Sequence, residues 1–152
     1  MPRSARPQGP ISTVRAFLAA LENLDIDGAL AYAAPDMLYQ NVPLPPARGR
    51  DAVERQLRLM ARYGTGFRAD IHNIASNGDT VLTERTDGLR AGRWQEEFWV
   101  CGTFELRDGQ IVLWRDYFDW ATVIGKGLVG TARAVTDTVK ARTGRRKVSS
   151  TG

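Results

Sequence analysis

Residues 80–118 read TVLTERTDGLRAGRWQEEFWVCGTFELRDGQIVLWRDYF, in which β-branched and aromatic residues lie between glycine-containing turns. Asp108-Gly109 suits a two-residue hairpin turn, because both central positions of that turn need a positive φ. Asn77-Gly78 suits a two-residue hairpin turn in the same way, and Ala91-Gly92 is a weaker signal of the same kind. The pattern predicts four antiparallel strands in a meander, at residues 67–75, 80–89, 94–106 and 110–118.

The first half of the chain has helical spacing instead. Apolar residues recur three and four positions apart in a first helix, with Ser12 placed to cap it: Val14, Phe17, Leu18, Leu21 and Leu24. A second helix is expected at 27–33, capped by Asp27 and ended by Pro35. A short strand at 37–42 and a proline-rich loop at 43–49 then precede a third helix, at 51–60, which ends before Gly64.

Helices followed by a twisted antiparallel sheet indicate an α+β domain, in which the helices cover one concave face of the sheet and leave a pocket. The 152 residues, 43% hydrophobic and 25% charged, suit one globular domain. We place this domain at residues 11–130. A disordered leader is expected at 1–10, an amphipathic stretch at 123–129, and a basic helix end with a frayed tail at 131–152.

The composition argues against several classes of function. No membrane-spanning run or export signal is recognisable, so a cytoplasmic protein without a membrane span is expected. The net charge of +4 comes largely from the two ends, and no nucleic-acid-binding motif lies between them, so no nucleic acid partner is expected. With one cysteine, Cys101, and one histidine, His72, the sequence predicts no disulfide framework and no metal site. We expect both side chains to be structural.

Charged residues share strand faces with apolar ones. Arg85 and Asp87 lie on the same face of their strand as Val81, Thr83 and Leu89, although this alternation along the strand also fits an ion pair on the solvent face. The last strand is more informative, because Asp116 is the one carboxylate on a bulky apolar face formed by Val112, Trp114, Phe118 and Trp120. Burial of an unpaired carboxylate costs several kcal/mol, so Asp116 is expected to lie beside a cation or to take up a proton. Arg85 is the natural partner.

Two carboxyls with an arginine between them can act as an acid and base pair, because close like charges force one group to keep its proton. Epoxide hydrolysis needs such a pair: a base takes a proton from the attacking water, and an acid protonates the ring oxygen. Ring strain supplies part of the driving force, so no cofactor or metal is required. Tyr39 and Asn41 share a face and could hold the water, although a purely structural tyrosine is an open alternative.

Three motifs in this order resemble the limonene-1,2-epoxide hydrolase family: Tyr39-Gln40-Asn41, Thr83-Glu84-Arg85-Thr86-Asp87 and Trp114-Arg115-Asp116-Tyr117-Phe118-Asp119. The similarity spans roughly residues 14–118, and the stretches at 81–87 and 98–102 look closest to the mycobacterial branch. The resemblance implies a cystatin-like α+β fold of the nuclear transport factor 2 (NTF2) type. Such a fold has a curved, mixed but mostly antiparallel sheet with N-terminal helices over a deep apolar pocket. The resemblance also implies a homodimer.

The resemblance further implies the role of each site residue. Asp116 would be the base that deprotonates water, Tyr39 and Asn41 would hold that water, Asp87 would protonate the epoxide oxygen, and Arg85 would orient both acids. The substrate would be a small hydrophobic epoxide, which the sequence does not narrow to a terpene, steroid, fatty or small cyclic compound. Strand parity and the resemblance together give the expected pocket walls: Leu18, Leu21, Leu89, Phe98, Val100 and Phe118.

Other functions on the same fold stay open at this point, because a fold does not fix a reaction. A SnoaL-like cyclase is one alternative. A ketosteroid-isomerase-type enzyme is another, although it would have no use for an arginine between two aspartates. A non-catalytic module that binds a hydrophobic ligand is the third, and it would have to keep buried charges that serve no reaction.

Overall fold

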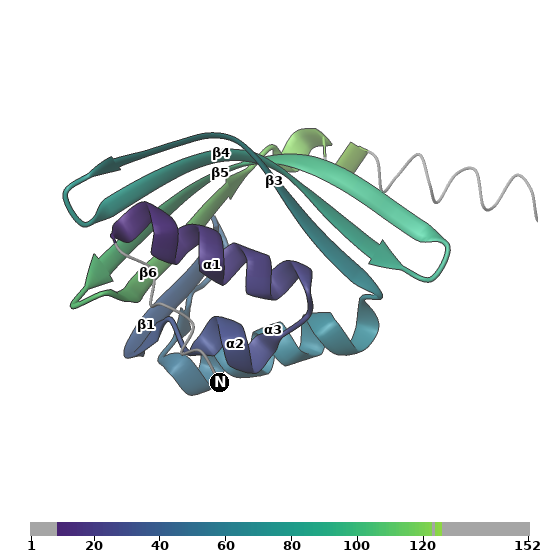
Figure 1. Ribbon diagram of the computed structural model, residues 1–152. Helices are drawn as coiled ribbons and strands as arrows, with labels where there is room; N and C mark the ends of the chain where they lie inside the picture. The colour runs from purple at the N-terminus through teal and green to yellow at the C-terminus, as the bar shows by residue number, and fades with distance from the viewer. Residues whose placement is uncertain (1–8, 123, 126–152) are drawn as a thin grey trace, which may run out of the picture. The chain divides into compact units, whose positions relative to one another are not determined.

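The predicted strands form part of one six-stranded sheet with the order β2-β1-β6-β5-β4-β3 (Figure 1). In this computed structural model, which describes residues 9–122, 124 and 125, the chain divides into two compact units, 1–118 and 119–152. The helices of the first unit are α1 (Pro10–Glu22), α2 (Ile26–Leu30) and α3 (Arg50–Tyr63). Its strands are β1 (Ala33–Val42), β2 (Ala47–Arg48), β3 (Gly66–Asn77), β4 (Thr80–Ala91), β5 (Trp94–Arg107) and β6 (Gln110–Phe118).

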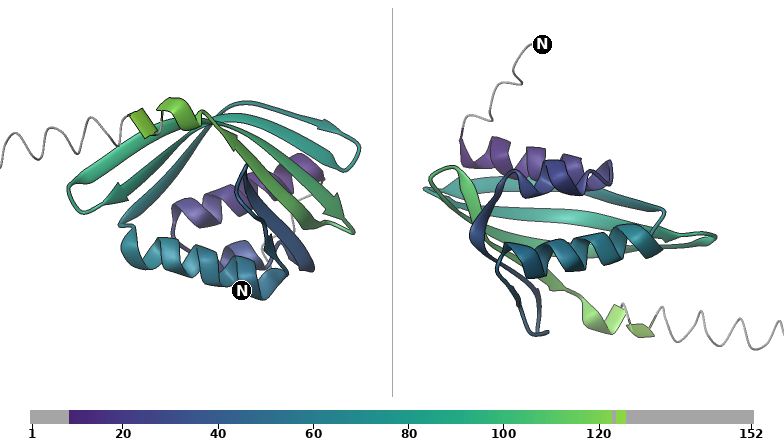
Figure 2. Two further views of the ribbon diagram at one scale, coloured as in Figure 1. Left: turned by 180° about the vertical axis from the view of Figure 1, so that it is seen from behind. Right: turned by 90° about the horizontal axis from the view of Figure 1, so that it is seen from below.

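The sheet is mixed and mostly antiparallel, which confirms the predicted α+β architecture. Strands β3 to β6 form the predicted meander, and among the described strands the only parallel pair joins β1 to β6. Figure 2 shows that the sheet curves strongly and that α1 and α3 lie across its concave side. The β5–β6 turn has positive φ at both Asp108 and Gly109, as predicted. At the β3–β4 turn the central residues are Gly78 and Asp79, one position later than expected, since Asn77 still belongs to β3.

Several predicted element ends are wrong by a few residues. Ser12 does not cap α1, because the helix already begins at Pro10, a residue whose fixed φ suits a first helical position. The cap of α2 is Asp25, whose carboxylate accepts a hydrogen bond from the Gly28 N–H, and not Asp27. Strand β1 starts at Ala33, where the sequence predicted the end of α2. Residues 47 and 48, predicted as loop, pair with β1 as the short strand β2.

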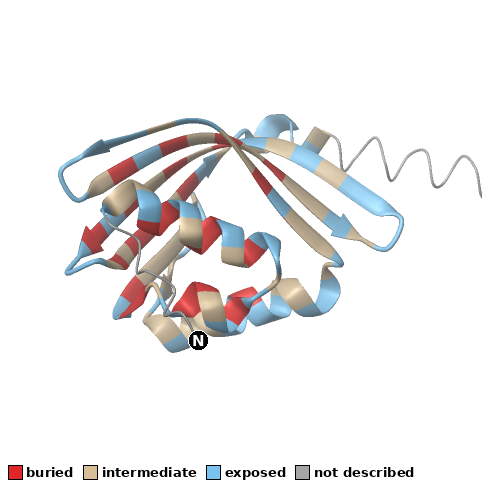
Figure 3. Ribbon diagram, viewed as in Figure 1, coloured by how far each residue is buried: buried red, intermediate tan, exposed pale blue. Residues whose placement is uncertain are grey.

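The core lies between the concave side of the sheet and the helices, as the buried positions in Figure 3 show. Helix α1 places Val14, Phe17 and Leu21 in this core, each of them fully buried. The Phe17 ring meets the Trp114 ring of β6 edge-on, with centroids 5.1 Å apart. Burial of one such apolar side chain contributes roughly 1.5–3 kcal/mol. The packing therefore fixes α1 against the strand that carries Asp116.

Two sequence predictions fall largely outside the described residues. The expected leader at 1–10 overlaps the structure only at Gly9 and Pro10, and the expected tail at 131–152 lies wholly outside it, so the domain limits stay a prediction. In the second unit, residues 120–122, 124 and 125 are helical, and the Asp119 carboxylate accepts a hydrogen bond from the Thr122 N–H at 3.2 Å. No helix within the described ranges is long and apolar enough to cross a membrane.

Candidate active site

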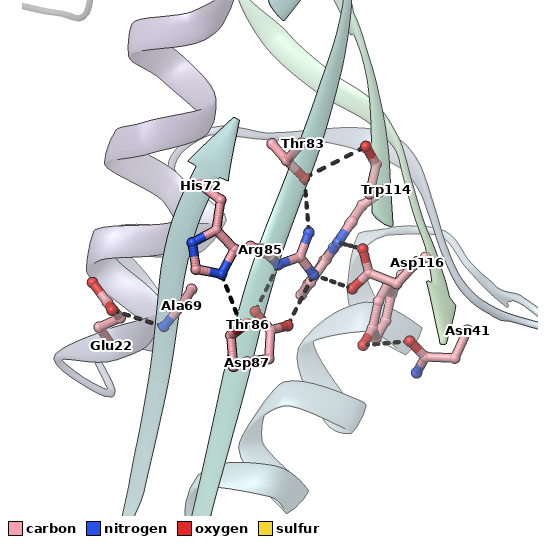
Figure 4. A network of polar contacts seen from close by, with 12 residues as sticks. Glu22, Asn41, Ala69, His72, Thr83, Arg85, Thr86, Asp87, Trp114 and Asp116 are labelled. Carbon is pink, nitrogen blue, oxygen red and sulfur yellow. Dashed lines mark hydrogen bonds and ion pairs between the residues drawn. The ribbon is translucent and has the colours of Figure 1, made fainter. Parts of the chain in front are cut away.

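Arg85 lies between two buried carboxylates on the concave side of the sheet (Figure 4). Its Nε donates to Asp87 Oδ1 at 2.7 Å, and its Nη2 donates both to Asp87 Oδ2 at 3.0 Å and to Asp116 Oδ2 at 2.6 Å. The exposed fractions of Arg85, Asp87 and Asp116 are 0%, 3% and 1%. The ion pair that alternation left open as a surface feature is therefore an interior one.

The sheet register brings these residues together. Thr83 of β4, Gly102 of β5 and Asp116 of β6 are consecutive partners across three strands, so their α-carbons lie in one row. Arg85 follows Thr83 by two positions, which places both side chains on the same face of β4. Its guanidinium passes over β5 to reach the carboxylate on β6.

Trp114 fixes the other side of the Asp116 carboxylate. Its indole Nε1 donates to Asp116 Oδ1 at 2.8 Å, while Arg85 occupies one lone pair of Oδ2. Each carboxylate oxygen has two lone pairs, so Asp116 can still accept a hydrogen bond from a water. The Trp114 ring also stacks on the Tyr39 ring, with centroids 4.0 Å apart.

Tyr39 and Asn41 enter the site from β1, the neighbour of β6. In the parallel β1–β6 pair, Tyr39 is opposite Trp114 and Asn41 is opposite Asp116. The Tyr39 hydroxyl donates to Asn41 Oδ1 at 3.1 Å. This bond leaves the hydroxyl lone pairs and the Asn41 amide N–H groups available for further hydrogen bonds, on the strand next to the one that carries Asp116.

Burial shifts the titration of both carboxyls upward. Burial raises the pKa of Asp116 to about 6, against the opposing effect of Arg85. Burial also raises the pKa of Asp87, again with Arg85 opposing it. Burial disfavours the charge on Arg85 as well, but its two carboxylate partners outweigh this effect and raise the pKa of the guanidinium. A pair that holds one proton together with a charged Arg85 has no net charge, which is the state that burial favours.

An apolar cavity of about 210 Å³ adjoins the two carboxyls. Four of the six predicted pocket walls line it: Leu21, Leu89, Phe98 and Phe118. Leu18 and Val100 do not. Leu18 of α1 is buried in the hydrophobic core. Val100 is fully buried in the sheet between the two larger residues that it pairs with, Arg85 and Phe118. Helix α3 and the start of β3 supply further cavity walls, which the alternation of residues along the later strands could not identify: Gln56, Leu57, Met60 and Phe67.

The remaining polar residues singled out in the sequence lie outside this cavity. Burial raises the pKa of the Cys101 thiol, which is the opposite of what a reactive cysteine needs. His72 Nε2 contacts the Thr86 hydroxyl at 2.8 Å, away from the carboxyl pair. Across residues 9–122, 124 and 125, no cluster of three or more His, Cys, Asp or Glu residues could hold a metal ion.

Sequence reasoning gave no role to Thr83, Gly102 or the Trp114 indole N–H. Thr83 shares a strand face with Arg85 and Asp87, and Trp114 shares one with Asp116. Packing beside the apolar residues of those faces explained both side chains equally well. Gly102 carried the clearer signal, because a glycine inside a strand often marks a place where another group approaches the backbone closely.

The sequence analysis placed Val112 on the same strand face as Asp116. A bulge opposite Glu105 and Leu106 instead buries Ile111 and leaves Val112 partly exposed.

Residues 8–128 match the family model of the limonene-1,2-epoxide hydrolase catalytic domain. The chain belongs to the limonene-1,2-epoxide hydrolase family. The resemblance inferred from the three sequence motifs is therefore confirmed. Arg85, both carboxyls, Tyr39 and Asn41 all lie inside the matched region.

Members of this family and more distant proteins are similar to the chain. Epoxide hydrolase EphG from Mycobacterium tuberculosis is 44% identical over 128 residues, which are 84% of this chain and 85% of that protein. The structure of an LEH-like epoxide hydrolase from M. tuberculosis has a TM-score of 0.74 at 43% identity, over 84% of this chain and 96% of that one. An NTF2-like protein from Burkholderia pseudomallei has a TM-score of 0.68 at 21% identity, over 76% and 94% of the two chains. These matches confirm the NTF2-like fold.

Proposed function

We propose that the protein is an epoxide hydrolase that adds water directly to a hydrophobic epoxide and releases a vicinal diol. The observation that carries this proposal is the buried Asp87–Arg85–Asp116 cluster at the wall of an apolar cavity. One reactant of this reaction is water, and the other is an uncharged strained ring. A paired acid and base in an apolar site match both requirements.

In the proposed step Asp116 is the base, because Tyr39 and Asn41 would hold the water on its side of the cluster. The water oxygen forms a bond to a ring carbon as the C–O bond of the epoxide breaks. One water proton passes to Asp116, and the proton of Asp87 passes to the ring oxygen. The diol leaves, and the two carboxyls return to their starting state by proton exchange with water. No cofactor takes part in this scheme.

The cavity favours a compact substrate. Its volume of about 210 Å³ is below the roughly 300–1,000 Å³ that is usual for sites of drug-sized ligands. Phe98 and Phe118 meet edge-on across its wall, with ring centroids 5.5 Å apart. We therefore expect an apolar epoxide of the small cyclic or terpene class to be a better substrate than one as bulky as a steroid.

Turnover in oxygen-18 water tests the direct attack. With enzyme in excess over the epoxide, the diol of the first turnover is expected to carry the label, since no ester intermediate forms. Mass spectrometry of the diol and of the recovered protein measures where the label lies. Unlabelled diol in the first turnover, or an adduct on either aspartate, would overturn the one-step scheme. No diol from any of a panel of apolar epoxides would count against the hydrolase itself.

We also propose a homodimer formed through the outer face of the sheet. Leu82 of β4, Trp99 of β5 and Tyr117 of β6 are exposed on this face, with Trp99 49% exposed. They lie around Cys101, which is opposite both Glu84 and Tyr117. An apolar patch on a sheet face is typical of a surface that a partner covers.

A cytoplasmic location stays a prediction from the sequence.

Sedimentation equilibrium is expected to give twice the 16.8 kDa mass of one chain. Trp99→Asp places a charge in the proposed interface and should give the mass of a single chain. Trp94→Asp is the matched control, because Trp94 is similarly exposed at 52% but lies on the opposite face of β5. A monomeric wild-type protein, or dissociation by both substitutions alike, would contradict this interface.

A further inference from the structure

The Arg85–Asp116 ion pair spans two strand spacings. Arg85 belongs to β4 and Asp116 to β6, and β5 lies between them. Neighbouring strands are about 4.8 Å apart, so the side chain must cover roughly 10 Å of sheet while it passes over the β5 backbone. The residue at the crossing point is Gly102, the partner of Thr83 on one side and of Asp116 on the other.

No side chain fits at this crossing. A β-carbon on Gly102 would lie 2.3 Å from Arg85 Nη1, 2.7 Å from Thr83 Oγ1 and 2.9 Å from Asp116 Oδ1. These separations are far inside van der Waals contact, and Arg85 cannot move aside without losing its bonds to the two carboxylates. The glycine is therefore required here for space.

Thr83 completes the attachment of the guanidinium. Its Oγ1 accepts a hydrogen bond from Arg85 Nη1 at 3.0 Å, and the hydroxyl donates to the Gly102 carbonyl oxygen at 3.5 Å. Nε and Nη2 are held by the carboxylates, so the Thr83 hydroxyl fixes the third nitrogen. Thr83 is itself 4% exposed, and a buried hydroxyl of this kind needs such partners.

We infer that Gly102 and Thr83 are positioning residues for the reaction: Gly102 gives the Arg85 guanidinium its path to Asp116, and Thr83 fixes its rotation. The inference rests on the proposed roles of Arg85 and Asp116. Neither residue touches the substrate in this scheme, since neither lines the cavity. Their effect reaches the reaction through the contact between the guanidinium and the base.

Gly102→Ala is expected to lower kcat by about 10²-fold and to leave KM within a few-fold, because a shift of about 1 Å in a catalytic group has an effect of this size. The acidic limb of the pH–kcat profile should also move to higher pH. The charged or titratable groups that face Asp116 are Arg85 and Asp87 of β4 and Tyr39 of β1, and Arg85 is the one that favours its ionised form. A loss of general packing would not move this limb.

Gly88→Ala is the matched control. Like Gly102, Gly88 lies inside a strand, here β4, but its added β-carbon would meet Arg68 Cβ at 3.6 Å and Glu97 Cγ at 3.8 Å, which are ordinary contacts. Its kcat and pH profile should equal those of the wild type. A Gly102→Ala enzyme with wild-type kcat and acidic limb would overturn the inference for Gly102.

Thr83 gives a second test, which decides the matter if Gly102→Ala does not fold. Thr83→Val keeps the shape and removes the hydroxyl, and it should lower kcat about tenfold, the effect of one lost hydrogen bond to a charged group. Thr83→Ser keeps the hydroxyl and should stay near the wild type. Equal kcat values for the two variants would overturn the inference. If Asp116→Asn remained active, the proposed function would fail instead, so the two failures are distinguishable.

Discussion

Asp116→Asn is expected to lower kcat for diol formation by roughly 10²–10⁴-fold, the usual contribution of a general base. Asparagine has almost the shape of aspartate, and its amide oxygen can still accept the Trp114 N–H that now reaches Oδ1 at 2.8 Å. It cannot take a proton from water at neutral pH. Steady-state kinetics on a compact apolar epoxide measures the loss, and circular dichroism confirms that the variant is folded.

Asp36→Asn is the matched control for this substitution. Asp36 accepts a hydrogen bond from Arg107 at 2.6 Å, so it too is paired with an arginine, but its side chain is 62% exposed and lies away from the cavity. This variant should keep the wild-type kcat. If Asp116→Asn kept more than about a tenth of the wild-type kcat, Asp116 would not be the base, because general-base effects are larger.

The pH profile of the wild type should report the same group. Burial raises the pKa of Asp116 to about 6, so a larger share of this acid is protonated at a given pH than for an ordinary aspartate. Only the ionised form can act as base, and kcat should therefore fall as pH drops through about 6. Asp87 must be protonated to act as acid, and burial raises its pKa too, so the rate should also fall where Asp87 loses its proton. A rate that rose steadily with pH would contradict this pairing.

The sequence was sufficient to predict that Arg85 and Asp116 come together, because the signals that place them are local. Asp108-Gly109 defined the turn before β6, and alternation then placed Asp116 on an apolar face. A carboxylate on such a face needs a cation, and Arg85 on a neighbouring part of the meander was the natural one. Their contact at 2.6 Å follows from register, which a chain of short hairpins leaves little freedom to change.

Other parts of the site depend on packing that no local pattern records. Helix α3 supplies Leu57 and Met60 to the cavity because of where it crosses the curved sheet, and its own periodicity shows only that one side is apolar. Val112 illustrates a second reason, since one bulge reverses the alternation on which its placement relied. Gly102 illustrates a third, because a glycine inside a strand signals that some group approaches it, and only the placed side chains show that this group is the Arg85 guanidinium.

Arg85→Met is expected to affect both activity and stability, since methionine keeps an apolar stem but removes the cation between two carboxyls that are 3% and 1% exposed. Loss of one partner of a buried ion pair typically costs about 3–5 kcal/mol. Without the cation, the pKa of Asp87 and of Asp116 should rise further, so that Asp116 is protonated near neutral pH and kcat falls by roughly 10²–10⁴-fold. Chemical denaturation and steady-state kinetics measure the two effects.

The pH dependence of stability identifies the cause of this destabilisation. When the pKa of an acid is raised in the folded state, its protonated form stabilises that state. This stabilisation is complete below the pKa of the unfolded state and is lost as pH rises through the pKa of the folded state. The Arg85→Met protein should therefore approach the wild type in acid and fall behind it as pH rises. Arg107→Met, which breaks the exposed pair with Asp36, should show little change at any pH.

A variant that removes all three charges completes the test. Arg85→Met combined with Asp87→Asn and Asp116→Asn leaves no buried ion without a partner, so much of the lost stability should return, although the protein stays inactive. This separation of stability from activity is what a charge cluster kept for catalysis requires. If the triple variant were less stable than Arg85→Met alone, the cluster would be a structural element first, and the roles proposed for its carboxyls would lose their main support.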